Sequence, residues 1–124
     1  MVSAADWQAG GGYLGFAGRS VFFRRGGSGP TLLLIHGFPT SSWDWARLWP
    51  QLTADHDVIA FDLLGFGRSD KPGDGDYRIT RQADLAEAVL AHCGVTRCTV
   101  LAHDYGDTVA QELLARHNEG GTRL

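Results

Sequence analysis

A short segment between two predicted elements places an acidic side chain where chemistry is expected. Asp104 follows an apolar run at 99–102 and precedes a helix that is predicted from about Gly106. So short a turn strains its central residue and lifts that side chain above the sheet edge, as in the strand–helix turn called a nucleophile elbow. Ala102 and Gly106 are its small neighbours, and the Tyr105 N–H at the start of the helix points at whatever binds beside the acid.

A second loop can supply another main-chain donor. His36, Gly37 and Phe38 follow a buried run at 31–35, which should neighbour the strand that precedes the acid. Gly37 permits a tight turn, so the Phe38 N–H can point back, and the N–H groups of Phe38 and Tyr105 would then form an oxyanion hole. An ionised carboxylate needs no base to attack carbon. The alternative role for this aspartate is to cap the following helix.

The elements that must position these loops alternate between strand and helix. Apolar runs at 31–35, 58–61 and 99–102 predict short buried strands. A hairpin is predicted over 13–16 and 20–24. Helices are expected over 43–54, with Ser41 and Ser42 as caps, from a capping Thr80 to Gly94, and from Gly106 onward. A β-hairpin followed by parallel βαβαβα is an α/β fold, in which ligands bind at the carboxyl ends of the strands.

Composition excludes several other classes of function. The 124 residues are 44% hydrophobic and 20% charged with a net charge of −3, which fits one globular domain without the basic surface of a nucleic-acid binder. No apolar run approaches the ~20 residues of a membrane span. The N-terminus lacks the pattern of a secretory signal, and Cys93 and Cys98 are too few for a disulfide framework. We expect a cytoplasmic protein with two small buried thiols and with no metal or other cofactor.

Three motifs, in this order, resemble the α/β-hydrolase superfamily. They are HGFPTSSWDW at 36–45, DLLGFGRSDKP at 62–72 and HDYGD at 103–107. The resemblance covers about residues 13–116. An aspartate at the nucleophile position is similar to the epoxide hydrolases and haloalkane dehalogenases. The third motif, with TVAQELL after it, looks closest to the mesoderm-specific transcript branch.

The resemblance implies a reaction on a small-molecule substrate. Asp104 would displace a leaving group at an sp³ carbon of an epoxide or alkyl halide, and water activated by a histidine would hydrolyse the resulting ester. We expect His36 and Gly37 to order the oxyanion loop. Asp62 and Arg68 are expected to pair and shape the floor of the pocket.

Several departures from the family pattern bear on activity. Tyr105 stands where haloalkane dehalogenases typically place a halide-binding tryptophan, and Phe38 has no side-chain donor. The family's lid, later strands, acid and histidine have no counterpart after Asp104. His117, thirteen residues along one helix, would be about 20 Å away. We therefore expect the N-terminal portion of a hydrolase, a single truncated domain over residues 1–124.

Two other interpretations stay open. The chain can be a non-catalytic remnant or a binding module of the same fold. The motif GFGRSD at 65–70 resembles half of a dinucleotide fingerprint, but it lacks the third glycine and a following helix, which makes a nucleotide-binding domain the weaker alternative. Trp43 can line a pocket or belong to the core, whereas Trp45 and His103 are expected to be structural.

Overall fold

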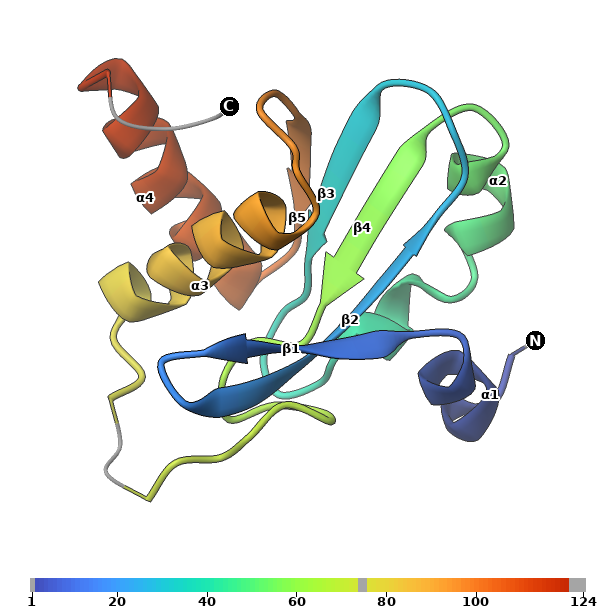
Figure 1. Ribbon diagram of the computed structural model, residues 1–124, viewed down its shortest axis with the longest axis horizontal. Coiled ribbons are helices and arrows are strands. Elements are labelled where there is room, and N and C mark those ends of the chain that lie inside the picture. Colours follow the sequence, from blue (N-terminus) through green and yellow to red (C-terminus); the bar gives the residue numbers. More distant parts are fainter. Residues whose placement is uncertain (1, 74–75, 121–124) are drawn as a thin grey trace.

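Five strands form one mixed sheet in the order β1-β2-β4-β3-β5. The computed structural model describes residues 2–73 and 76–120, and helices flank the sheet (Figure 1). The strands β3, β4 and β5 are parallel, and the β1–β2 hairpin joins them through an antiparallel pairing of β2 with β4. This confirms the predicted hairpin and parallel α/β arrangement. The strands are β1 Gly12–Phe16, β2 Arg19–Gly26, β3 Thr31–Ile35, β4 Asp57–Phe61 and β5 Thr99–Ala102.

The hairpin closes with a two-residue turn in which both residues have a left-handed backbone. Ala17 has a φ of 50° and Gly18 a φ of 78°. Turns of this kind match the right-handed twist of the strands that they join. The resulting register pairs Leu14 with Val21, and both side chains are buried against the sheet.

The central strands β3 and β4 are buried on both faces, as their continuous apolar composition predicts. Because strand side chains alternate, each strand contributes to two cores. One core lies under α3 (Ile79–His92) and α4 (Tyr105–Asn118), and it includes Leu33, Ile35, Ile59, Phe61, Leu85, Val89, Val109 and Leu113. The other core includes Leu32, Leu34, Val58, Ala60 and three tryptophans, Trp7, Trp45 and Trp49.

The predicted helix over 43–54 is wrong as one continuous element. The structure has a 3₁₀ turn, η1 (Ser42–Trp45), and a separate short helix, α2 (Trp49–Thr53). Pro50 lies in the first turn of α2 and explains the break, because it lacks the N–H that a continuous helix would need there. Ser41 caps η1, with its hydroxyl accepting the Trp43 N–H at 3.2 Å.

The helix before Tyr13 was not predicted, and the cap residue of the helix around Thr80 was predicted incorrectly. A six-residue helix, α1 (Ala4–Ala9), begins after the cap Ser3 and buries Trp7, although a helix this short leaves no periodic signal. Thr80 does not cap α3, because the helix starts one residue earlier, after Arg78. The other end of α3 agrees with expectation, since Gly94 follows the helix with a φ of 71°.

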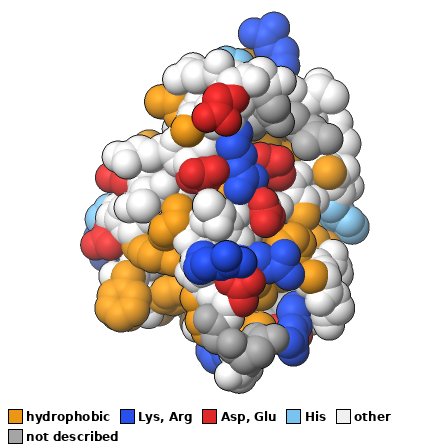
Figure 2. All heavy atoms as spheres, turned by 90° about the vertical axis from the view of Figure 1, so that its left-hand side faces the viewer, with side chains coloured by type: hydrophobic (Ala, Val, Ile, Leu, Met, Phe, Trp, Pro, Cys, Tyr) orange, Lys and Arg blue, Asp and Glu red, His pale blue; other side chains and the backbone are white. Residues whose placement is uncertain are grey.

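The strand β5 lies at the edge of the sheet, paired only with β3 among the described residues. It is therefore not buried on both faces as predicted, and Leu101 is 38% exposed. The helix α4 follows it and packs against α3. Arg116 of α4 joins the two helices by ion pairs to Asp84 at 2.9 Å and Glu87 at 3.0 Å on α3, and it also pairs with Glu112 of its own helix at 2.8 Å. Figure 2 shows a basic side chain surrounded by acidic ones at the centre of this face.

Candidate active site

The turn between β5 and α4 holds Asp104 in a backbone conformation that side chains rarely adopt. Two residues, His103 and Asp104, connect the strand to the helix, and Asp104 has φ 55° and ψ −121°. A non-glycine residue in this region is strained, and such residues cluster at functional sites. The expected strain at the centre of the turn is therefore present. The Asp104 side chain is exposed at the carboxyl end of the parallel strands.

Two glycines bring the neighbouring loop against this turn. A Cβ atom on Gly106 would lie 2.5 Å from the Ile35 carbonyl oxygen and 2.6 Å from that of His36, so the first turn of α4 presses on the end of β3. A Cβ atom on Gly37 would lie 2.7 Å from the Cβ of Asp104. All three distances are shorter than real Cβ contacts, so both positions require glycine.

The carboxylate of Asp104 is held by the start of α4. Its Oδ1 accepts a short hydrogen bond from the Tyr105 N–H. The N-terminal end of a helix also favours negative charge. Phe38 directly follows Gly37, so its main chain belongs to the loop that adjoins this carboxylate.

His36 is fully buried and ties two loops together. Its Nε2 accepts the Leu63 N–H at 3.0 Å, and its Nδ1 lies 2.8 Å from the Gly37 carbonyl oxygen. Because Nε2 accepts, the proton belongs on Nδ1, which donates to Gly37. Burial lowers the pKa of His36 and favours this neutral form. Both ring nitrogens are therefore engaged: Nδ1 fixes the ring within the loop after β3, and Nε2 holds that loop to the loop after β4.

Asp62 and Arg68 meet, but not through the guanidinium group. The buried Asp62 carboxylate accepts the Arg68 main-chain N–H at 2.8 Å on Oδ2 and the Ser42 N–H at 2.8 Å on Oδ1. Arg68 itself is exposed. The expected pairing is thus made by the backbone, and it requires the left-handed Gly67, whose Cβ would lie 2.2 Å from Asp62 Oδ2.

The loop after β4 folds back onto the sheet instead of opening a helix. Asp70 forms two hydrogen bonds with Ser20 of β2. The Asp70 N–H donates to the Ser20 carbonyl at 2.8 Å, and the Asp70 carboxylate accepts the Ser20 N–H at 2.7 Å. The next helix, α3, begins only at Ile79. The GFG motif therefore does not lead directly into a helix, as the dinucleotide fingerprint does. Residues 74–75 of the predicted loop lie outside the described residues.

An aromatic cavity of about 450 Å³ opens beside the Asp104 turn. Its lining comes from four separate segments of the chain and consists of Phe38, Leu64, Gly65, Phe66, Tyr77 and Tyr105. Sequence reasoning singled out Phe38 and Tyr105 only for their main-chain N–H groups. It missed Phe66 and Tyr77. The one local signal for them is that each is an aromatic residue within a polar loop segment that contains glycine.

Other predicted aromatic and histidine residues lie away from this cavity. The Trp43 ring is at the surface, where its Nε1 donates to the Val2 carbonyl at 3.1 Å. Trp45 is in the core, as expected. His103 lines a different hollow, of about 390 Å³, together with Asp44, Trp45 and Leu48. His117 lies in the last turns of α4.

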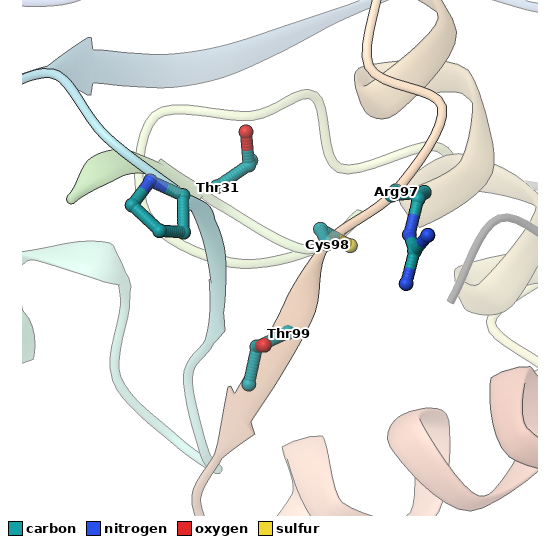
Figure 3. Close-up of a pocket in the computed structure, with 5 residues that line it drawn as sticks. Thr31, Arg97, Cys98 and Thr99 are labelled. Carbon is teal, nitrogen blue, oxygen red and sulfur yellow. The ribbon is translucent and has the colours of Figure 1, made fainter.

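A third hollow, of about 290 Å³, lies at the opposite ends of the strands. It is lined by Pro30, Thr31, Arg97, Cys98 and Thr99, and Figure 3 shows Thr31 on β3 across from Thr99 on β5. Cys98 and Cys93 are free and only partly buried, in contrast to the buried thiols that were expected. Burial raises the pKa of both, which keeps the thiols protonated and poorly nucleophilic.

Two other kinds of feature are absent from the part of the chain that the structure describes. Within residues 2–73 and 76–120, no group of three or more His, Cys, Asp or Glu side chains is arranged to hold a metal ion. No helix in the same ranges is long and apolar enough to cross a membrane.

Several known proteins are similar to this chain in sequence or in structure. The chain is 47% identical to the bovine mesoderm-specific transcript homolog protein over 121 residues, covering 92% of this chain and 36% of the bovine protein. It is 39% identical to a soluble epoxide hydrolase from a Corynebacterium species over 93 residues, covering 75% of this chain and 32% of that protein. A haloalkane dehalogenase structure from Bradyrhizobium elkanii superposes with a TM-score of 0.80 and 34% identity, covering 87% of this chain and 36% of that one.

The chain spans about a third of the length of these relatives. A sequence model described as the alpha/beta hydrolase fold matches residues 30–120, which include β3, β4, β5 and the Asp104 turn. With the observed strand order and the relatives above, this match shows that the chain belongs to the alpha/beta hydrolase fold family.

Proposed function

We propose that this chain supplies the nucleophile and the oxyanion-holding loops of a hydrolase that acts on an epoxide or an alkyl halide. The observation that carries the proposal is the strained backbone of Asp104, whose carboxylate accepts a hydrogen bond from the Tyr105 N–H. Relatives named as an epoxide hydrolase and a haloalkane dehalogenase support this substrate class.

The proposed reaction begins with the free carboxylate oxygen of Asp104. It forms a C–O bond to an sp³ carbon of the substrate while the bond from that carbon to the epoxide oxygen or halogen breaks. The halide leaves as an anion, whereas the epoxide oxygen becomes an alkoxide that takes a proton from water. The product is an ester on Asp104. When water later attacks that ester, negative charge develops on Oδ1, where the N–H groups of Tyr105 and Phe38 stabilise it.

Hydrolysis of the ester needs a general base that the described histidines do not supply in this geometry. Both nitrogens of His36 are engaged, His103 faces another hollow, and His117 lies far along α4. We therefore assign the base to a part of the parent enzyme outside residues 1–124. On its own, the chain is expected to react once at Asp104 and to remain alkylated.

Covalent labelling tests the proposal. The chain is incubated with an excess of an epoxide, digested, and mapped by mass spectrometry, so that an ester on Asp104 is distinguished from thioethers on Cys93 and Cys98. We expect the Asp104 adduct in the unchanged chain and its loss in Asp104→Asn, while the cysteine adducts persist in both. Equal modification of the 104-containing peptide in the variant would contradict the proposal. Multiple turnover by the unchanged chain would instead assign the base to a histidine within it, His36 or His103.

A further inference from the structure

The cavity beside Asp104 has the surface chemistry of a site for a flat, neutral ring. The described residues that line it are all uncharged, and four of the six are aromatic. Its volume of about 450 Å³ falls in the range of small-molecule pockets, ~300–1,000 Å³.

The aromatic rings around the cavity form a connected set centred on Phe66. The Phe66 ring lies 5.9 Å from Phe38 at 86° and 5.9 Å from Tyr105 at 41°, and it also packs edge-on against His36 at 5.3 Å. These are the separations at which aromatic rings attract one another. The Phe38 ring is 65% exposed, so one of its faces is open to a further ring.

The polar atoms of the two tyrosines are directed to the main chain. The Tyr77 hydroxyl donates to the Pro72 carbonyl at 2.6 Å, and the Tyr105 hydroxyl lies 3.4 Å from the Tyr77 carbonyl. Burial raises the pKa of Tyr105, which keeps this hydroxyl protonated. The rings, and not the hydroxyls, are therefore what the tyrosines offer to a bound molecule.

Tyr105 connects this cavity to the nucleophile. Its N–H bonds the Asp104 carboxylate, while its ring forms part of the cavity wall. A molecule bound among the rings would therefore contact the residue whose N–H holds the Asp104 carboxylate. We infer that the preferred substrate carries an aromatic ring close to its electrophilic carbon and that Phe66 and Phe38 select for this ring, an inference that rests on the proposed function.

Two epoxides of similar intrinsic reactivity test this selection. Benzyloxirane and butyloxirane have the same terminal epoxide, but only the first carries a ring, and that ring is insulated from the epoxide by a CH₂ group. Each reacts by opening of the epoxide C–O bond, ester formation on Asp104 and protonation of the alkoxide by water. The readout is the ratio of the two initial rates of Asp104 labelling in the 124-residue chain, with the rates at which the two epoxides react with acetate in solution as the measure of intrinsic reactivity.

We expect Asp104 to favour benzyloxirane beyond the ratio of the two rates seen with acetate. Phe66→Leu should reduce that preference by roughly two- to ten-fold, the rate equivalent of the ~0.5–1.5 kcal/mol of an aromatic pair. Phe23→Leu is the matched control, because Phe23 packs on His92 outside the cavity lining and should leave the ratio unchanged. If Phe66→Leu loses its native circular dichroism, Phe38→Leu replaces it, since the exposed Phe38 ring contributes little to folding.

The outcomes separate the two claims. Absence of an Asp104 adduct with either epoxide overturns the proposed function. If the two epoxides label Asp104 in the same ratio as they react with acetate, or if the preference for benzyloxirane survives in both cavity variants, the selection by aromatic rings is overturned while the nucleophile stands.

Discussion

Gly37 and Asp104 lie so close together that any side chain on Gly37 would displace the acid. The position of a Cβ on Gly37 is 2.7 Å from the Asp104 Cβ and 3.1 Å from the His103 carbonyl oxygen. This contact joins the loop after β3, to which Phe38 belongs, to the strained turn after β5. The close approach of two loops thus depends on the absence of one methyl group.

Gly37→Ala should therefore destabilise the fold and slow the labelling of Asp104. Overpacking of this kind costs about 1–3 kcal/mol. Urea unfolding measures the loss, and the matched control is Gly15→Ala, because a Cβ on Gly15 meets no heavy atom within 4 Å. Equal shifts of the unfolding midpoint in both variants would show that the contact with Asp104 is not responsible.

The Tyr105 N–H can be removed without removing the helix that it begins. Tyr105 is the first residue of α4, where proline is well tolerated, so Tyr105→Pro deletes the donor to Asp104 Oδ1. Loss of one such donor typically slows a reaction by about 100-fold or more. Hydrolysis of the Asp104 ester in alkaline solution, the step in which charge develops on Oδ1, should slow on this scale in Tyr105→Pro.

Tyr105→Phe is the comparison, since it keeps both the N–H and the ring. It should retain far more reactivity than the proline variant when both show the circular dichroism of the unchanged chain. If the two variants react at the same rate, the Tyr105 N–H has no role in the reaction, and any loss relative to the unchanged chain is due to the Tyr105 side chain.

The sequence signals that succeeded are local ones. The strands β3 and β4 are continuous apolar runs, and the Asp104 turn follows from a strand and a helix with almost nothing between them. The boundaries that failed depend on single residues, such as Pro50, which divides the expected helix over 43–54.

The aromatic cavity was not predicted, because its residues meet only after the chain has folded. Phe66 and Tyr77 belong to one long loop, whereas Phe38 and Tyr105 follow two different strands. Their composition alone is equally typical of core residues. The hydrogen bonds of Asp62 illustrate the same limit, since the sequence indicates an ion pair with Arg68 and the structure uses the Arg68 backbone.

His36 should make the stability of the chain depend on pH. Burial lowers its pKa below the ~6.5 of an exposed imidazole, so between the two pKa values the unfolded chain binds more protons than the folded one. Stability is full above the unfolded pKa and declines as the pH falls below it, by at most about 1.4 kcal/mol per pH unit. Urea unfolding from neutral to mildly acidic pH measures this slope.

His36→Gln isolates the contribution of this ring. Glutamine does not titrate, so the variant should lose the part of the acid slope that His36 causes, whatever its absolute stability. The same slope in both proteins would mean that other groups control the pH dependence and that His36 does not enter the fold as a neutral ring.

Arg116, which pairs with acids of α3 and α4, should contribute more to the stability of the fold than the exposed Arg78. Its side chain is 22% exposed and bonds Glu112, Glu87 and Asp84, and its Nη2 also donates to the Thr80 carbonyl at 3.0 Å. These acids hold its pKa above the ordinary value for arginine. Arg116→Met removes all of these bonds and leaves three carboxylates near one another. We therefore expect the free energy of unfolding to fall by about 1–3 kcal/mol, the cost of leaving hydrogen-bonding groups unpaired.

Arg78→Met is the control, because Arg78 is 76% exposed and pairs with Asp76. Exposed pairs of this kind contribute about 0–1 kcal/mol. The difference between the two variants in urea should shrink in high salt, which screens the repulsion among the carboxylates. A loss in Arg116→Met no larger than that in Arg78→Met would show that α3 and α4 are held together by their apolar contacts alone.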